Sequence, residues 1–219
     1  CAGRKKGLYK CEKCAIMKNK REAREMERKK NQTKKKIVSA AWRLFYEQGY
    51  ENTTVDDIVE LSGTSKGSFY HYFEGKDALL SSLSILFDEK YEELTPRMNP
   101  EMNSFDKLMY LNRELFSMIE RTVPIDLLAR MYSTQLVTRG EKHLLDHNRV
   151  YYRLLRSIVL EGQERGQINR EIPAAEIIKL YALCERALLY DWCICSGEYS
   201  LTLYSQKMMP LFLAEARGQ

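Results

Sequence analysis

The segment from Thr54 to Leu80 constrains the fold most, because it contains two short amphipathic stretches separated by a tight glycine turn. The oxygen of Thr54 can cap the first turn of a helix, while Asp56 and Asp57 lie at its positive end. Apolar residues at i, i+3, i+4 spacing continue this helix until the pair Ser62-Gly63 breaks it. This layout is typical of a helix-turn-helix.

The second stretch predicts a short helix with one face in the core. Thr64 or Ser65 can cap it, and Phe69 and Phe73 are one turn apart, so we expect them to anchor it. The outward face then consists of Lys66, Gly67, Tyr70 and His71. Glycine lowers helix stability by about 1 kcal/mol relative to alanine. A glycine on an outward face is useful where another backbone, such as that of DNA, comes close.

At these residues the chain resembles the TetR (tetracycline repressor) family of bacterial one-component regulators. The resemblance extends from about Lys34 to Leu83 and includes Gln48-Gly49-Tyr50 at the end of the preceding helix. Glu74 is a departure from the pattern of the family. An acid at this position would repel a phosphate. The predicted DNA-binding residues are Thr54, Lys66, Gly67, Ser68, Tyr70, His71, Tyr72 and Lys76.

The resemblance also implies the rest of the function. It predicts a homodimer that binds a near-palindromic double-stranded DNA operator and responds to a small-molecule effector. The last two helices would pair with their counterparts in the second copy, in a four-helix bundle. Their apolar content agrees with this pairing, and the residues concerned are Ile177, Leu180, Tyr181, Leu188, Leu203, Met208, Leu211 and Phe212.

Charge is distributed unevenly along the chain. Residues 1–36 contain 15 Lys and Arg against 4 Asp and Glu, whereas residues 37–219 contain 20 against 26. A basic arm on an acidic body indicates that the arm meets a polyanion, and the alternative is a solvated, partly disordered tail. Residues 1–16 precede Met17, and an upstream extension or an added remnant is the interpretation that we favour. The Cys11-x-x-Cys14 pair lacks a second metal-binding pair, so we expect spectator thiols.

Helical periodicity predicts an all-α chain of about nine helices. We expect a basic arm over residues 1–32, a helix-turn-helix domain over 33–80, and a helical effector-binding and dimerisation domain over 81–219. A hydrophobic content of 44% can form a core for both domains. Beyond a long helix from Lys76 to Leu94, the predicted helices are Ser104–Arg121, Ile125–Thr138, Lys142–Arg165, Ala174–Ile194 and Leu201–Glu215.

Large adaptable side chains and several acids in the second half suggest a pocket for a flat or cationic apolar compound. Most of these residues, taken singly, are expected to be ordinary core. The candidate ligand-binding residues are Tyr110, Glu114, Phe116, Met131, Tyr132, Tyr152, Tyr181, Glu185 and Trp192.

The sequence therefore predicts a DNA-binding transcriptional regulator, a repressor released by a small, largely apolar ligand. The alternative is a redox- or metal-responsive regulator on the same scaffold. His143 and His147 are one helical turn apart, and Cys184, Cys193 and Cys195 lie near each other, but a solvated helix start and small packed side chains are the simpler interpretations.

Enzyme motifs are absent: the chain has no Gly-x-Ser-x-Gly, phosphate-binding glycine loop or zinc-protease pair. We predict no catalytic residue, cofactor or metal site. Nor does any segment reach the 18 to 20 apolar residues that span a bilayer. With cysteines that do not form a disulfide framework, this predicts a cytoplasmic protein.

Overall fold

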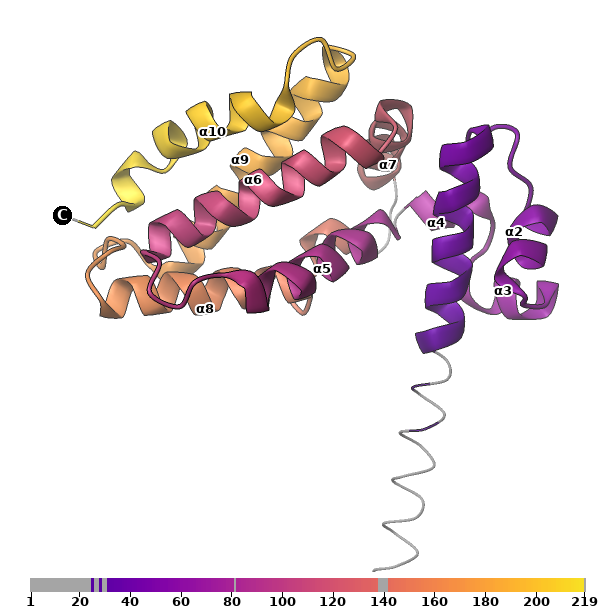
Figure 1. Ribbon diagram of the computed structural model, residues 1–219, viewed down its shortest axis with the longest axis horizontal. Coiled ribbons are helices and arrows are strands. Elements are labelled where there is room, and N and C mark those ends of the chain that lie inside the picture. Colours follow the sequence, from indigo (N-terminus) through magenta and orange to yellow (C-terminus); the bar gives the residue numbers. More distant parts are fainter. Residues whose placement is uncertain (1–24, 26–27, 29–30, 81, 138–141, 219) are drawn as a thin grey trace, which may run out of the picture. The chain divides into compact units, whose positions relative to one another are not determined.

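The computed structural model describes residues 25, 28, 31–80, 82–137 and 142–218. The predicted basic arm before residue 25, including Cys11 and Cys14, lies outside them, as does the side chain of His143. The chain divides into two compact units, one up to Lys76 and one from Asp77 onward. Figure 1 labels their helices.

The first unit consists of a helix over residues 31–48, α2 (Val55–Ser62) and α3 (Lys66–Tyr72), and it ends where α4 (Lys76–Leu80) begins. Aromatic contacts link its core: the ring centroids of Phe45 and Tyr50 are 5.0 Å apart, and those of Phe69 and Phe73 are 5.8 Å apart. The buried apolar side chains of this unit are Ile37, Val38, Ala40, Ala41, Trp42, Phe45, Tyr50, Ile58, Phe69 and Phe73.

The predicted start and end signals of α2 are confirmed. The Thr54 hydroxyl accepts a hydrogen bond from the Asp57 amide, and the Asp57 carboxylate accepts one from the Thr54 amide, so the two form a capping box. The amide hydrogen bond lowers the pKa of Asp57. Gly63 ends the helix with φ 61°, a left-handed conformation that favours glycine. Ser65, one of the two proposed caps, caps α3 by accepting a hydrogen bond from the Ser68 amide.

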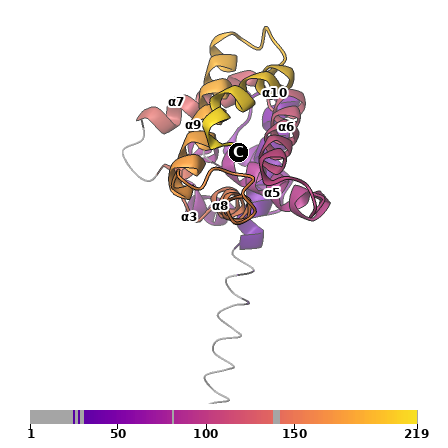
Figure 2. The same cartoon turned by 90° about the vertical axis from the view of Figure 1, so that its left-hand side faces the viewer.

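The second unit is a bundle built on α5 (Leu83–Leu94), α6 (Ser104–Thr122), α8 (Val150–Glu164), α9 (Ala174–Ile194) and α10 (Leu201–Phe212). In the view of Figure 2, α6, α8, α9 and α10 surround a common core, and α7 (Ile125–Val137) packs on α9. Short 3-10 turns follow α5, precede α8 and follow α10, at Thr95–Arg97, His143–Leu145 and Ala214–Ala216.

Two predicted helices differ strongly from the structure in their bounds. The long helix expected from Lys76 to Leu94 is two helices, because the Ser82 amide and hydroxyl both donate to the Leu79 carbonyl and close a tighter turn there. The helix expected from Lys142 begins at Val150 instead. The Asp146 carboxylate accepts from the Asn148 amide, and this local turn competes with helix.

The all-α class of about nine helices is confirmed. Among the described residues, the one pairing of β type is an isolated bridge between Ile168 and Arg217. No helix in this part of the chain is both long and apolar enough to cross a membrane. The last helix ends at Phe212, three residues before its predicted end at Glu215.

Candidate DNA-binding surface and effector cavity

The outward face of α3 is formed as predicted. Phe69 is fully buried and holds the helix on the core, whereas Lys66, Tyr70 and His71 are exposed. The Tyr70 ring, 56% exposed, packs edge-on against Phe69 with the centroids 5.3 Å apart. The ring of His71 packs in the same manner on Tyr72, at 4.8 Å. These ring contacts hold polar aromatic side chains in place at the surface.

Gly67 lies on this face without an internal reason to be glycine. Its φ is not positive, and a Cβ at this position would meet only the Ser65 hydroxyl, at 3.9 Å. An alanine would therefore fit within the unit. The close approach of another backbone at Gly67 stays a prediction.

Lys66, at the start of α3, forms an ion pair with Asp56 of α2 at 2.7 Å. This hydrogen bond and the carboxylate charge raise the pKa of Lys66. Both side chains are about two-thirds exposed, so solvent screens the pair and it is easily exchanged for another anion. A phosphate is such an anion.

Lys76 has an internal role that the sequence did not reveal. Its ammonium donates to the carbonyl oxygens of Tyr50, Glu51 and Thr53, at 2.9, 3.3 and 3.2 Å. It also lies 4.4 Å from the centroid of the Tyr50 ring. Because an ammonium has three donors, its hydrogen bonds are fully used in holding the loop before α2. Phosphate contact by Lys76 stays a prediction that requires it to leave these carbonyls.

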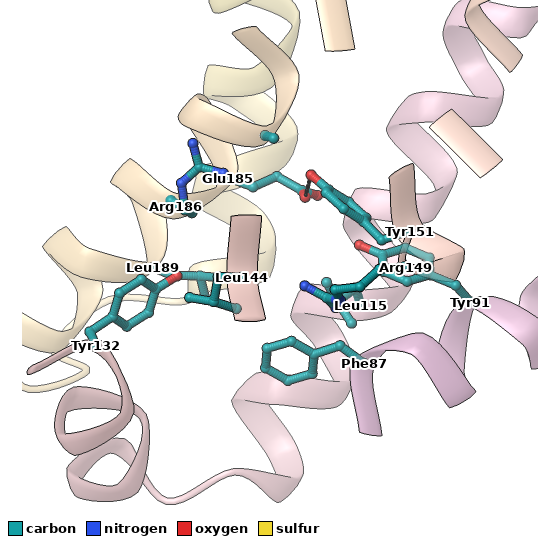
Figure 3. Close-up of a pocket in the computed structure, with 11 residues that line it drawn as sticks. Phe87, Tyr91, Leu115, Tyr132, Leu144, Arg149, Tyr151, Glu185, Arg186 and Leu189 are labelled. Atoms are coloured by element: carbon teal, nitrogen blue, oxygen red, sulfur yellow. Dashed lines mark hydrogen bonds between the residues drawn. The ribbon is translucent and has the colours of Figure 1, made fainter. Parts of the chain in front are cut away.

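A cavity of about 40 Å³ lies in the second unit, between α5, α6, α7, α8 and α9. Figure 3 shows the aromatic side chains of Phe87, Tyr91, Tyr132 and Tyr151 around it. The remaining lining residues are Leu115, Leu144, Arg149, Ala182, Glu185, Arg186 and Leu189. Ligand pockets usually measure roughly 300 to 1,000 Å³, so a ligand of ordinary size must displace side chains to enter.

Glu185 is the buried carboxylate of this cavity. One of its oxygens accepts a hydrogen bond from the Asn112 amide at 2.9 Å, and the other accepts from the Tyr151 hydroxyl at 2.8 Å. Burial raises the pKa of Glu185, and these hydrogen bonds oppose the rise. Both carboxylate oxygens are therefore already bound to donors of the protein.

A second polar group is a largely buried ion pair. Arg149, the residue before α8, donates through two nitrogens to the two Asp88 oxygens, at 3.1 and 2.9 Å, and also to the Ser84 carbonyl. Asp88 further accepts from the Tyr151 amide at 3.4 Å. The pair links α5 to the first turn of α8 along one wall of the cavity.

The cavity includes two of the nine predicted ligand-binding residues, Tyr132 and Glu185. Phe116, Met131 and Tyr181 are fully buried core instead, and the remaining four form contacts elsewhere. The prediction could not separate these groups, because helical spacing alone does not distinguish core from cavity. These four are Tyr110 (against Arg113), Glu114 (with Arg113), Tyr152 (to the Leu144 carbonyl) and Trp192 (to the Tyr199 carbonyl). The cavity residues that the sequence did not single out are Phe87, Tyr91, Leu115, Leu144, Arg149, Tyr151, Ala182, Arg186 and Leu189.

Tyr132 separates this cavity from a second hollow of about 200 Å³ between α7 and α9. The hollow is lined by Ala129, Tyr132, Ser133, Leu136, Tyr190, Cys193 and Ile194. Tyr132 is the residue that the two linings share.

The described residues give no support to a redox or metal trigger. Burial raises the pKa of the Cys184 thiol, and it raises that of Cys193 to about 11, which keeps both in the unreactive thiol form. His147 packs on the Tyr152 ring at 4.5 Å. Within the described part of the chain, no group of three or more metal-binding side chains comes together.

Comparison with known proteins agrees with these observations. Residues 37–83 match the model for bacterial regulatory proteins of the tetR family. The uncharacterised HTH-type transcriptional regulator YhgD of Bacillus subtilis is 25% identical over 166 residues, which cover 73% of this chain and 83% of YhgD. The HTH-type transcriptional regulator QacR of Staphylococcus aureus is 32% identical over 92 residues, which cover 42% and 49%.

The fold has solved counterparts as well. FadR of Thermus thermophilus, a TetR family transcriptional repressor in complex with lauroyl-CoA, aligns with a TM-score of 0.62 and 22% identity, covering 83% of this chain and 93% of FadR. Its resemblance extends through both units, whereas the family model matches the helix-turn-helix region. Residues 37–83 are therefore similar to the DNA-binding region of the tetR family of bacterial regulatory proteins, and the chain is similar to transcriptional regulators over a longer part of its length.

Proposed function

We propose that the protein is a homodimeric repressor that binds a near-palindromic operator through α3 and leaves it when a small, largely apolar effector enters the second unit. The observation that carries this proposal is the outward face of α3. It presents a cation, two aromatic rings with polar atoms and a glycine, none of which the packing of the unit requires.

The contacts expected at the operator follow from the chemistry of this face. Lys66 exchanges Asp56 for a phosphate, and the Thr54 and Ser68 hydroxyls have hydrogens to donate to the backbone. Tyr70, His71 and Tyr72 are the candidates for contacts with base edges in the major groove. The closest backbone approach is expected at Gly67.

Two copies are needed because a short recognition helix contacts few base pairs, and half-sites about 34 Å apart match one turn of DNA. The surface that supports dimerisation is an exposed apolar one on α9 and α10. Ile177, Tyr181 and Leu188, which the sequence suggested for it, are buried within the unit instead. The exposed apolar residues are Leu183, Tyr190, Ile194, Leu203, Tyr204, Leu211 and Phe212.

The second unit is proposed to sense the effector. Its aromatic cavity and the adjoining hollow supply apolar walls, and entry of a ligand would separate α5 from α8 or α7 from α9. Since α5 follows α4 and α3 in the chain, such a shift would favour a dimer whose recognition helices no longer fit two successive grooves. The lauroyl-CoA of the Thermus thermophilus repressor makes acyl compounds a reasonable first class to test.

The experiment is an electrophoretic gel shift with the DNA upstream of the gene for this protein. We expect tight binding by the wild-type chain and a loss of about 100-fold or more in the Lys66→Ala/Tyr70→Ala variant, whose dimer stays intact. The control is Tyr46→Ala, which removes an equally exposed tyrosine from the first helix. Retention of specific binding by the double variant would refute the role of α3.

A further inference from the structure

Some hydrogen-bonding groups of the cavity have partners within the protein, and others have none. The acceptor oxygens of Glu185 both receive hydrogen bonds from the protein. Tyr91 is 1% exposed and lines the cavity, yet its hydroxyl has no hydrogen-bond partner among the described residues. A buried hydroxyl without a partner costs free energy, so this position is one where a bound molecule would be stabilised.

Arg186, which carries a full positive charge, is a second group of the cavity whose hydrogen-bond donors lack a partner. It lines the cavity beside Glu185, where its positive charge acts to lower the pKa of that carboxyl, and within the described part of the chain it forms no hydrogen bond or ion pair. A guanidinium has five donors and no acceptor. The other arginine of the lining, Arg149, is neutralised by Asp88. The hydrogen-bond donors that the cavity leaves without an acceptor are therefore those of Arg186 and of the Tyr91 hydroxyl.

We propose that the cavity binds the acidic head group of an apolar effector, with Arg186 and the Tyr91 hydroxyl as donors to it. The aromatic walls and the hollow beyond Tyr132 receive the apolar part. This rests on the proposed sensing role of the second unit and reverses one expectation from the sequence, that the acids of this region favour a cationic compound. Glu185 already accepts a hydrogen bond at each carboxylate oxygen and lies beside the charge of Arg186, so it is not an unpartnered anion for a cationic compound.

Three probes with one tail test the head group: dodecanoic acid, dodecylamine and dodecanol, titrated calorimetrically into the full chain below their micelle concentrations. A charge-assisted hydrogen bond to a largely buried head corresponds to roughly tenfold in affinity. We therefore expect dodecanoic acid to bind about tenfold more tightly than either other probe. Equal affinities, no binding of any probe, or a preference for the amine would overturn the proposal.

Two variants assign the residues. Arg186→Gln is expected to lower the affinity for dodecanoic acid about tenfold and to leave that for dodecanol unchanged, and Tyr91→Phe to lower it by a smaller factor. Arg156→Gln is the matched control, because it removes an exposed arginine of α8 outside the lining. Equal effects of Arg186→Gln and Arg156→Gln would contradict the assignment. No DNA is present, so failure here is distinct from failure of operator binding.

Discussion

The two candidate sites differ in how much space they leave. On α3, a Cβ at Gly67 would meet nothing closer than a hydroxyl at 3.9 Å, and the neighbouring side chains are exposed. In the second unit, a Cβ at Gly162 of α8 would lie 2.7 Å from both Ile168 and Ser104. The first unit thus leaves the outward face of α3 uncovered. The second has a filled interior, in which a ligand must move side chains.

Gly162→Ala is expected to have the largest effect on stability, because it adds a methyl group at a tightly packed position of the second unit. The added methyl cannot fit without moving Ile168 or the Ser104 side chain, and overpacking of this kind costs about 1 to 3 kcal/mol. Urea unfolding measures the loss. The control is Ser157→Ala, an exposed position in the same helix, where a change within about 0.5 kcal/mol is expected. If the two variants are equally stable, α8 is less tightly packed than described.

Glu185→Gln tests the buried interior of the second unit through the pH dependence of the free energy of unfolding. Burial raises the pKa of Glu185, so the folded chain holds this proton more tightly than the unfolded chain. The free energy of unfolding is then expected to fall as pH rises from the ordinary pKa of glutamate to the raised one, and to level off above it. The variant should lose this slope.

The measurement is thermal unfolding across that pH window, for wild type, Glu185→Gln and the control Glu176→Gln, which changes an exposed glutamate at the start of α9. The control should keep the wild-type slope. Coinciding profiles of wild type and Glu185→Gln would show that this carboxylate is not desolvated.

The open site could be predicted from the sequence because its determinants are local. The capping box of Thr54 and Asp57 and the Ser65 cap each act within three residues. Gly63 likewise ends α2 through its own backbone conformation. Such signals can be identified without knowing the tertiary fold.

The cavity could not be predicted in the same way, since its lining comes from five helices that are far apart in sequence. Arg149 and Asp88 are 61 residues apart, and Asn112 and Glu185 are 73 apart. Apolar periodicity marks Phe116, Met131 and Tyr181 as strongly as Tyr132, and only packing separates core from cavity. Lys76 shows the same limit in the first unit, because its carbonyl partners are 23 to 26 residues away.

Gly67→Ala tests whether the outward face of α3 is shaped for DNA. Its two readouts are the free energy of unfolding and the affinity for the operator. We expect the variant to gain about 0.5 kcal/mol in free energy of unfolding, because alanine favours helix and fits the free space. We expect at the same time an operator affinity about tenfold weaker, because the methyl obstructs the approaching backbone. A gain in stability with operator affinity unchanged or increased would contradict the account.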